Sequence, residues 1–187
     1  MLGLILRDNF YVLSGGPAAG KTSLLLELQK RGYAIAPEIA RELIKEQQLT
    51  NGNALPWKDK ILYKEIMFDR SIQSFKEIDQ VEGQTKPIFF DRSFIDSICY
   101  ARLIQSEVSE QMIDYVERWR YNTQVFMLPP WKEIYETDSE RKQQWEEAVL
   151  TYEMMVDTYK SYGYQIIELP KTTVNERADF VIKAVQK

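Results

Sequence analysis

The chain has 187 residues, of which 44% are hydrophobic and 28% are charged, values that are ordinary for one globular domain with a buried core. Its formal net charge of -4 provides no general attraction to nucleic acid, so we expect no nucleic-acid partner. The absence of histidine excludes His-based metal sites, Ser-His-Asp triads and histidine general bases, and the single cysteine, Cys99, excludes an intramolecular disulfide.

The chain opens with the apolar residues 1–6 (MLGLIL), which Arg7 and Asp8 follow at once. This segment is too short for a signal-peptide core or a membrane span, and no later stretch approaches the roughly eighteen apolar residues that a span requires. We therefore expect a cytoplasmic protein with no membrane partner. The role of residues 1–6 and the oligomeric state cannot be read from the sequence.

A strand predicted at residues 10–14 leads into GGPAAGKT at residues 15–22 and then into a helix at 21–31. The segment matches G-x-x-x-x-G-K-[ST], in which glycines let the backbone N–H groups and the helix N-terminus approach phosphate oxygens. Lys21 would place its charge between the last two phosphates, and Thr22 would offer its hydroxyl to Mg²⁺. The alternative is a glycine-rich turn without a ligand. The predicted nucleotide-binding residues here are Gly15, Pro17, Ala18, Ala19, Gly20, Lys21, Thr22 and Ser23.

A second strand is predicted at residues 33–36, followed by a helix from 37 to about 48. Glu38 lies just beyond this strand, and in an open α/β sheet the ligand binds beyond the carboxyl ends of the strands. Glu38 could then accept a proton from an attacking hydroxyl. Alternatively, it only stabilises the start of the helix, with Arg41 as a surface partner three residues later.

After a loop at residues 50–56, the apolar periodicity predicts a long amphipathic helix from about 57 to 78. Its expected buried residues are Ile61, Leu62, Ile66, Ile72 and Phe75. Residues 81–86 (VEGQTK) are then expected to form a loop.

The third predicted strand, residues 87–90, ends at Asp91, and a helix is predicted at about 93–104. Asp91 is placed to hold Mg²⁺, or it caps the helix that follows. The next residue is Arg92, which cannot act as a base but can stabilise phosphate charge, so this pair favours phosphoryl transfer over hydrolysis. Asp96 lies on the same helix face as Arg92 and either orients it, touches substrate or forms a simple helix ion pair.

Another helix is predicted at residues 109–120 and a fourth strand at 124–128, where two prolines stop it. Residues 129–145 are expected to form a lid-like segment. Residues 137–140 (TDSE) have the spacing of a capping box, so a helix that runs to about residue 162 should begin there. Arg141 near its start opposes the helix dipole, so local structure alone does not explain it. The segment resembles the lid of nucleotide kinases, whose arginines close on the phosphates, and this resemblance makes Arg141 a candidate lid arginine. The alternative is an ordinary charged helix face.

The fifth strand is predicted at residues 164–169 and the last helix at 174–185. In this kind of fold the adenine often rests against the loop after the last strand, so Lys171, Thr172 and Thr173 are candidates for that contact. The alternative is a plain loop in which Thr173 caps the helix. The alternation of strands and helices predicts one α/β domain over residues 1–187, with a mainly parallel five-stranded sheet between layers of helices.

These motifs resemble those of known families. GGPAAGKT resembles the loop of adenylate-kinase-type enzymes, the strand followed by Glu38 resembles deoxynucleoside kinases and ribosylnicotinamide-kinase domains, and DRS at residues 91–93 resembles deoxynucleoside and thymidylate kinases. With APEIAREL, FFDRSFIDSICYARL, PPWKEIY and DSER, the chain is most similar to a group of predicted ATPases with an AAA-type ATPase domain. The resemblance implies a P-loop NTPase fold with strand order 2-3-1-4-5, in which the Asp91 strand lies beside the Gly15 strand.

The chain departs from the AAA motors, because Asp91 is followed by Arg92 instead of Glu and no room is left for their helical lid domain. It also lacks the N-K-x-D signature of guanine recognition, which favours ATP. We expect an ATP- and Mg²⁺-dependent kinase with a small hydroxylated, nucleoside-like acceptor, in which Lys21, Glu38, Arg92 and Arg141 are catalytic and Thr22 and Asp91 bind the metal. The alternatives are an ATP-dependent switch or weak ATPase acting with a protein partner, and a nucleotide-binding module that has lost activity.

Overall fold

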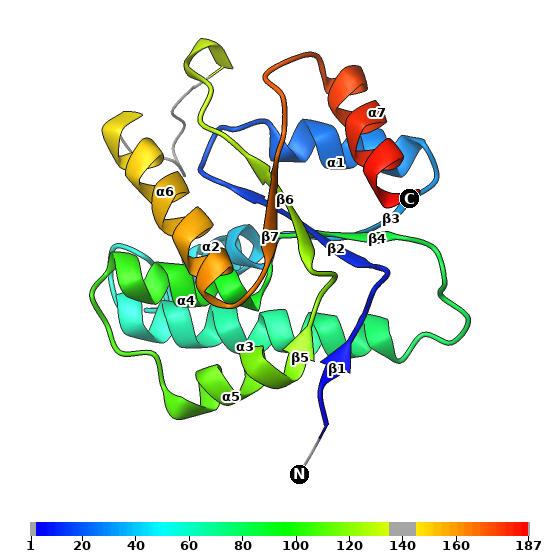
Figure 1. The fold of residues 1–187 in the computed structure, drawn as a ribbon. Helices are drawn as coiled ribbons and strands as arrows, with labels where there is room; N and C mark the ends of the chain where they lie inside the picture. The colour runs from blue at the N-terminus through cyan, green and yellow to red at the C-terminus, as the bar shows by residue number, and fades with distance from the viewer. Residues whose placement is uncertain (1–2, 135–144, 187) are drawn as a thin grey trace.

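The computed structural model describes residues 3–134 and 145–186. Its central sheet consists of β2 (Phe10–Gly15), β3 (Ala34–Ala36), β4 (Ile88–Asp91), β6 (Gln124–Leu128) and β7 (Gln165–Glu168). All neighbouring strands pair in parallel, in the order β3-β4-β2-β6-β7 (Figure 1). This is the predicted fold class, and the order is the expected one for the five predicted strands.

Two further strands form a separate small sheet that the sequence did not predict. β1 (Ile5–Leu6) pairs in parallel with β5 (Trp119–Arg120), which lies where the predicted helix at 109–120 was expected to continue. Each strand has two residues, too few to show an alternating pattern. The pairing holds the start of the described chain against the segment that leads into β6.

Helices cover both faces of the central sheet (Figure 1). They are α1 (Lys21–Lys30), α2 (Ile39–Leu49), α3 (Lys60–Asp79), α4 (Phe94–Leu103), α5 (Glu110–Arg118), α6 (Trp145–Ser161) and α7 (Val174–Val185), with a short 3-10 turn at Lys132–Ile134. α1 and α7 pack on one face, while α3, α4, α5 and α6 pack on the other. α2 packs against α3 through the buried residues Leu43, Tyr63 and Met67.

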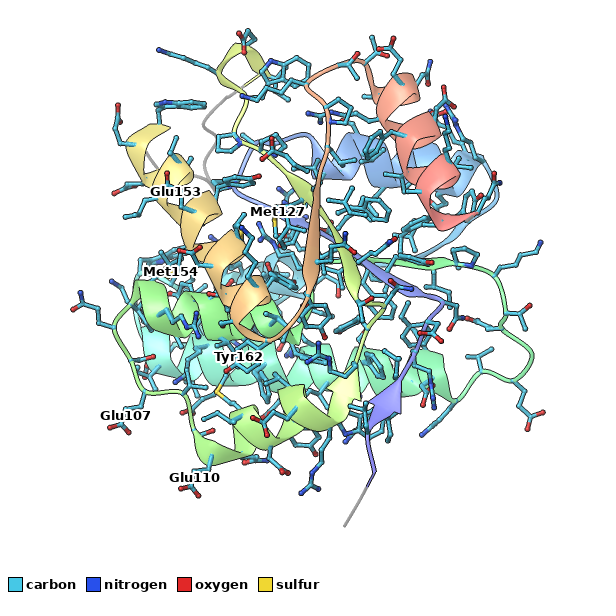
Figure 2. All side chains as sticks on the ribbon, in the orientation of Figure 1. Glu107, Glu110, Met127, Glu153, Met154 and Tyr162 are labelled. Atoms are coloured by element: carbon cyan, nitrogen blue, oxygen red, sulfur yellow. The ribbon has the colours of Figure 1, made fainter. Side chains whose placement is uncertain are left out.

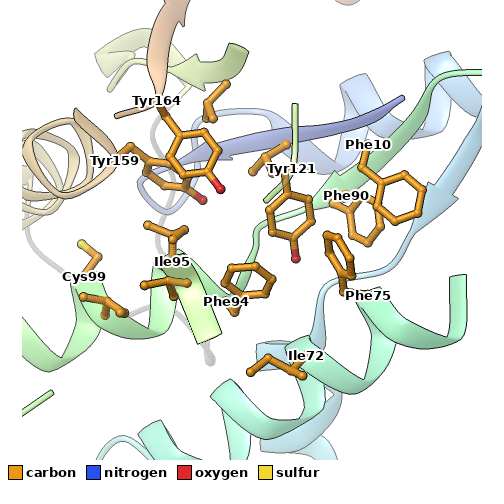
Figure 3. Packing of buried hydrophobic residues seen from close by; sticks show 14 of the residues in the cluster. Phe10, Ile72, Phe75, Phe90, Phe94, Ile95, Cys99, Tyr121, Tyr159 and Tyr164 are labelled. Carbon is orange, nitrogen blue, oxygen red and sulfur yellow. The ribbon is translucent and has the colours of Figure 1, made fainter. Parts of the chain in front are cut away.

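The core lies on both sides of the sheet because successive strand residues point to opposite faces. Val12 belongs to the cluster under α3 to α6, whereas its neighbour Leu13 belongs to the cluster under α1 and α7. Figure 3 shows the aromatic centre of the first cluster, where the rings of Phe75 and Tyr121 lie 4.8 Å apart between their centroids. Burying each such ring contributes on the order of 2 kcal/mol to stability.

Many charged side chains lie at the periphery, although Lys21, Lys64, Asp91, Asp96 and Arg177 are buried. Figure 2 shows Glu107, Glu110 and Glu153 pointing away from the molecule, while Met127 lies inside it. None of the helices in the described ranges is long and apolar enough to cross a membrane.

α1 and α7 begin at the predicted residues, whereas α2, α3, α4 and α5 begin one to three residues later than predicted. α3 begins at Lys60, after Asp59 accepts a hydrogen bond from the Leu62 N–H at 2.9 Å. Its predicted buried side is confirmed at Ile72 and Phe75, and Ile66 is partly buried, but Ile61 and Leu62 are exposed. The buried residues of the helix are Tyr63, Lys64, Met67, Phe68, Ser71, Ile72 and Phe75.

Candidate active site

The turn between β2 and α1 has a backbone path that two glycines make possible. Gly15 has a φ of 149°, and a Cβ there would lie 2.5 Å from the carbonyl oxygen of Leu128 on the neighbouring strand. Gly20 has a φ of 84°, and a Cβ there would lie 3.0 Å from Nη1 of Arg177. Ala18 also has a positive φ, of 54°, which is uncommon for a residue with a side chain. The turn thus has the strained shape expected of a loop that points its N–H groups inward.

The predicted phosphate-binding residues are brought together in this turn and in the first turn of α1: Gly15, Pro17, Ala18, Ala19, Gly20, Lys21, Thr22 and Ser23. Lys21 is buried, and its Nζ lies 3.4 Å from the carbonyl oxygens of both Gly15 and Gly16. Thr22 and Ser23 are exposed at the helix N-terminus. The lysine charge, the hydroxyls and the first N–H groups of α1 therefore share one small region.

Asp91 ends β4, directly beside the strand that leads into this turn. It pairs in register with Leu13, and the Arg92 N–H donates to the Leu13 carbonyl at 3.0 Å. The carboxylate is buried, and among the described residues its Oδ1 has no hydrogen-bond partner. Burial raises the pKa of Asp91, while the charge of Lys21 acts in the opposite direction. The residue that caps α4 is Ser93, so the structure does not support Asp91 as the helix cap.

Glu38 and Arg92 meet across the ends of two neighbouring strands. Glu38 follows β3 as the N-cap residue of α2, and its Oε1 accepts a hydrogen bond from Nε of Arg92 at 3.1 Å. Nη1 of Arg92 lies 3.2 Å from Oδ1 of Asp96. Arg41 lies within 3.7 Å of the second Glu38 oxygen. Glu38 is therefore part of a charge cluster and not a solvated helix end.

This cluster fixes the protonation state of Glu38. Burial alone would raise its pKa, but the positive charges of Arg92, Lys21 and Arg41, with the hydrogen bond from Arg92, lower the pKa to about 2. Burial opposes the charge of Arg92, yet Glu38 and the other nearby carboxylates raise its pKa well above the ordinary value. Both side chains are thus charged at neutral pH.

A narrow pocket opens between α2, α3 and the end of β4. Its cavity volume is about 20 Å³, which is room for about one water molecule. A nucleoside-sized molecule would enter only if the lining side chains moved. The lining residues include Pro37, Ala40, Met67, Ser71, Asp91 and Arg92.

The loop after β7 has the alternative arrangement given above, in which Thr173 caps the following helix. Thr173 is the N-cap of α7 and forms a capping box with Glu176, which also accepts a hydrogen bond from Thr172. Lys171 is exposed. Contact of Lys171 and Thr172 with a base remains a prediction, and so does the role of Arg141, which lies outside the described residues with most of segment 129–145.

Arg177, which no sequence motif predicted as part of the site, is a buried arginine that supports the phosphate-binding turn. Its Nη1 donates to the carbonyl of Ala19 at 3.0 Å and its Nε to the carbonyl of Pro170 at 2.9 Å. Its guanidinium carbon lies 4.9 Å from the centroid of the Trp131 ring. The sequence feature that could have indicated its burial is its position beside Ala178 and four residues before Val181, on the apolar face of the last helix.

Comparisons with known proteins agree with this geometry. A family model described as AAA domain matches residues 10–177. Deoxyadenosine kinase from M. mycoides has a TM-score of 0.63 at 16% identity, over 95% of this chain and 98% of that one. Thymidylate kinase from Ehrlichia chaffeensis has a TM-score of 0.63 at 17% identity, over 98% and 100%. A NadR protein in complex with NR has a TM-score of 0.66 at 18% identity, over 96% of this chain but 51% of that one.

A search of curated protein sequences found no match. The structural identities are low, so those structures show a common fold, whereas the family match spans most of the chain. The chain therefore belongs to the AAA domain family and has the P-loop fold of nucleoside and nucleotide kinases.

Proposed function

We propose that this protein is an ATP-dependent kinase that transfers the γ-phosphate to a hydroxyl group of a small, nucleoside-like acceptor. The observation that carries this proposal is the Glu38–Arg92 pair at the same sheet edge as the phosphate-binding turn. Two structural neighbours support this acceptor class, since the deoxyadenosine kinase was solved with dCMP as a product and the NadR protein with NR.

On the nucleotide side, the backbone of the turn and Lys21 would hold the phosphates. Asp91 and Thr22 would hold Mg²⁺, and the buried Asp91 Oδ1 without a hydrogen-bond partner in the described chain fits a metal ligand. In the described ranges no three acidic or cysteine side chains form a metal cage, which suits an ion bound largely by phosphates. Bound Mg²⁺ would neutralise charge on the β- and γ-phosphates. Lys171 and Thr172 remain candidates for contact with the base.

On the acceptor side, Glu38 would take the proton of the attacking hydroxyl. The acceptor oxygen forms its bond to the γ-phosphorus as the bond to the β-phosphate oxygen breaks, and ADP leaves. While it is paired with Arg92, Glu38 has a pKa of about 2 and is a weak base. Attraction of Arg92 to the transferring phosphate would weaken the Glu38–Arg92 ion pair. The pKa of Glu38 would then rise during the transfer, and Glu38 would become a stronger base.

The competing function is an ATP-dependent switch or weak ATPase that acts with a protein partner. In the AAA motors a Glu after the metal-binding Asp polarises the attacking water, and here Arg92 takes that position. Arginine cannot accept a proton, so this site has no base at that position for efficient hydrolysis. A switch that binds ATP and changes shape would not need one.

An ADP-release screen tests the proposal. We expect ADP to appear with Mg²⁺ and ATP only when a panel of nucleosides, nucleotides and vitamin-like alcohols contains the acceptor, and Lys21→Ala should abolish the signal. Glu38→Gln should lower acceptor-dependent turnover by about 10²-fold or more. Slow ADP release that no acceptor stimulates would support the switch, and unchanged transfer by Glu38→Gln would refute its role as the base.

A further inference from the structure

The carboxylate of Asp96 contacts Nη1 of Arg92, whereas Glu38 contacts its Nε. Its Oδ1 lies 3.2 Å from Nη1 of Arg92 and accepts a hydrogen bond from Oγ of Ser14 at 2.6 Å. Ser14 lies on β2, directly before the glycine that begins the phosphate-binding turn. One carboxylate oxygen therefore links the arginine to the strand that carries that turn.

The second oxygen of Asp96 links the same carboxylate to α6. Oδ2 accepts hydrogen bonds from the Ser93 N–H at 2.9 Å and from the Tyr159 hydroxyl at 2.6 Å. The hydroxyl oxygens of Ser93 and Tyr159 are 2.6 Å apart. Capping α4 requires only Ser93 and Asp96, so the contacts from Ser14 and Tyr159 are additional to what helix formation needs.

α6 also contacts the phosphate-binding turn at its other end. A Cβ on Gly16 would lie 3.3 Å from the carbonyl oxygen of Ala148, in the first turn of α6. Tyr159 lies farther along the same helix, roughly 16 Å away at 1.5 Å per residue. Figure 1 shows α6 as one helix running from the level of that turn down to α4. α6 therefore lies against the phosphate-binding turn at one end and contacts the Asp96 carboxylate through Tyr159 farther along.

We infer that Asp96 and Tyr159 are positioning residues that hold the Arg92 guanidinium and couple its orientation to the place of α6 beside the phosphate-binding turn. Asp96 is 6% exposed, and Arg92 is the cation that it contacts. With three hydrogen-bond donors around the Asp96 carboxylate besides the arginine, the orientation of the carboxylate is fixed. The consequence for catalysis rests on the proposed kinase function, whereas the positioning itself does not.

The test is nuclear magnetic resonance of the arginine side chains, which needs no acceptor. Signals of Arg92 are assigned by their loss in Arg92→Lys, and the exchange of its guanidinium protons with water is measured. Tyr159→Phe keeps the ring and removes the hydroxyl, and we expect exchange at Arg92 to become about tenfold faster, the factor typical of one lost hydrogen bond to a charged group. The matched control is Tyr164→Phe, because the ring of Tyr164 packs 5.6 Å from that of Tyr159 and is also buried (Figure 3).

The outcomes distinguish a specific effect of Tyr159 on the position of Arg92 from a general loss of packing in the core. Faster exchange in Tyr159→Phe but not in Tyr164→Phe, with the same backbone amide spectrum, supports the inference. Wild-type exchange in Tyr159→Phe, or equal acceleration in both variants, overturns it. Ser14→Ala gives an independent test from β2, should Tyr159→Phe not fold. Once an acceptor is known, Tyr159→Phe should lower kcat several-fold and leave KM for ATP unchanged, so a failed acceptor screen does not affect the exchange result.

Discussion

At the scale of single residues, the site is an arrangement of charges in which each group restrains another. Arg92 lies between two carboxylates, Glu38 and Asp96, and both ion pairs are largely shielded from water. Removing one partner from such a cluster leaves a buried charge without compensation, which is more costly than losing an exposed ion pair. The positive φ of Arg92, 70°, shows that the backbone also bends to place this side chain.

The first prediction follows from the low pKa of Glu38. Its pKa is about 2 in the folded protein and 4.5 ordinarily, so the folded state favours the ionised carboxylate. Its contribution to stability is therefore complete above about pH 4.5 and is lost as the pH falls through about 2. We expect the free energy of unfolding of wild type to fall more steeply in this window than that of Glu38→Gln. Urea unfolding of both proteins at several pH values measures this, and parallel curves would contradict the ion pair.

Residue identities at this site were predictable only where a local pattern carries them. Lys21, Thr22 and Asp91 belong to short motifs, and Glu38 and Arg92 each follow a strand that the sequence shows. The contact of Asp96 with Arg92 was predictable from their spacing of four residues, and the structure shows it. The contacts of Asp96 with Ser14 and Tyr159 were not predictable, because these residues approach it from 82 and 63 positions away in the chain. Motif spacing has no information on such long-range contacts.

At the scale of elements, the last helix, α7, supports the phosphate-binding turn that leads into the first helix, α1. Arg177 on α7 reaches the carbonyl of Ala19 just before α1 and the carbonyl of Pro170 just after β7. It is 2% exposed, and burial lowers its pKa, so its placement costs solvation free energy that these contacts must offset. It thus joins the phosphate-binding turn to the loop where the base is expected.

We predict that Arg177→Met weakens ATP binding. The substitution keeps much of the side-chain volume but removes both hydrogen bonds, so the turn should lose its support and the dissociation constant for ATP should rise about tenfold, as for one or two lost hydrogen bonds. Calorimetric titration with ATP measures it. Lys183→Met is the matched control on the same helix, because Lys183 is exposed. Equal affinities for Arg177→Met and Lys183→Met would show that the turn holds its shape without Arg177.

Elements were predicted best where the apolar pattern is long. The strand at 124–128 and the helix at 174–185 have the predicted bounds, and the other four strands of the central sheet differ from prediction by one residue at one or both ends. Helix starts were less predictable, as α2 shows by beginning at Ile39 after the extended Glu38 instead of at Pro37. β1 and β5 form only through their mutual pairing, which no local pattern records.

At the scale of the whole molecule, the parallel sheet brings the residues of the candidate site together. Because every strand of the central sheet points the same way, the ends of β3, β4 and β2 bring Glu38, Asp91 and the phosphate-binding turn to one edge. Folding therefore buries the carboxylate of Asp91 at this edge, where, under the proposed function, a metal ion and phosphates would compensate its charge. In the free protein that carboxylate is a cost to stability, since burial raises its pKa.

The last prediction tests whether the Asp91 carboxylate lowers the stability of the free protein but contributes to Mg²⁺ binding. Since the raised pKa of Asp91 means that folding disfavours its ionised form, Asp91→Asn should leave the melting temperature of the free protein unchanged or raise it. In wild type, Mg²⁺ with ATP at about one hundred times its dissociation constant should add about 2.7 kcal/mol of stability. Asp91→Asn should lose the part of this gain that depends on Mg²⁺ and keep the part given by ATP alone. Thermal unfolding of both proteins, with ATP and with or without Mg²⁺, separates the two. A lower melting temperature of free Asp91→Asn, together with an intact Mg²⁺-dependent gain, would mean that the buried carboxylate serves the fold and not the metal.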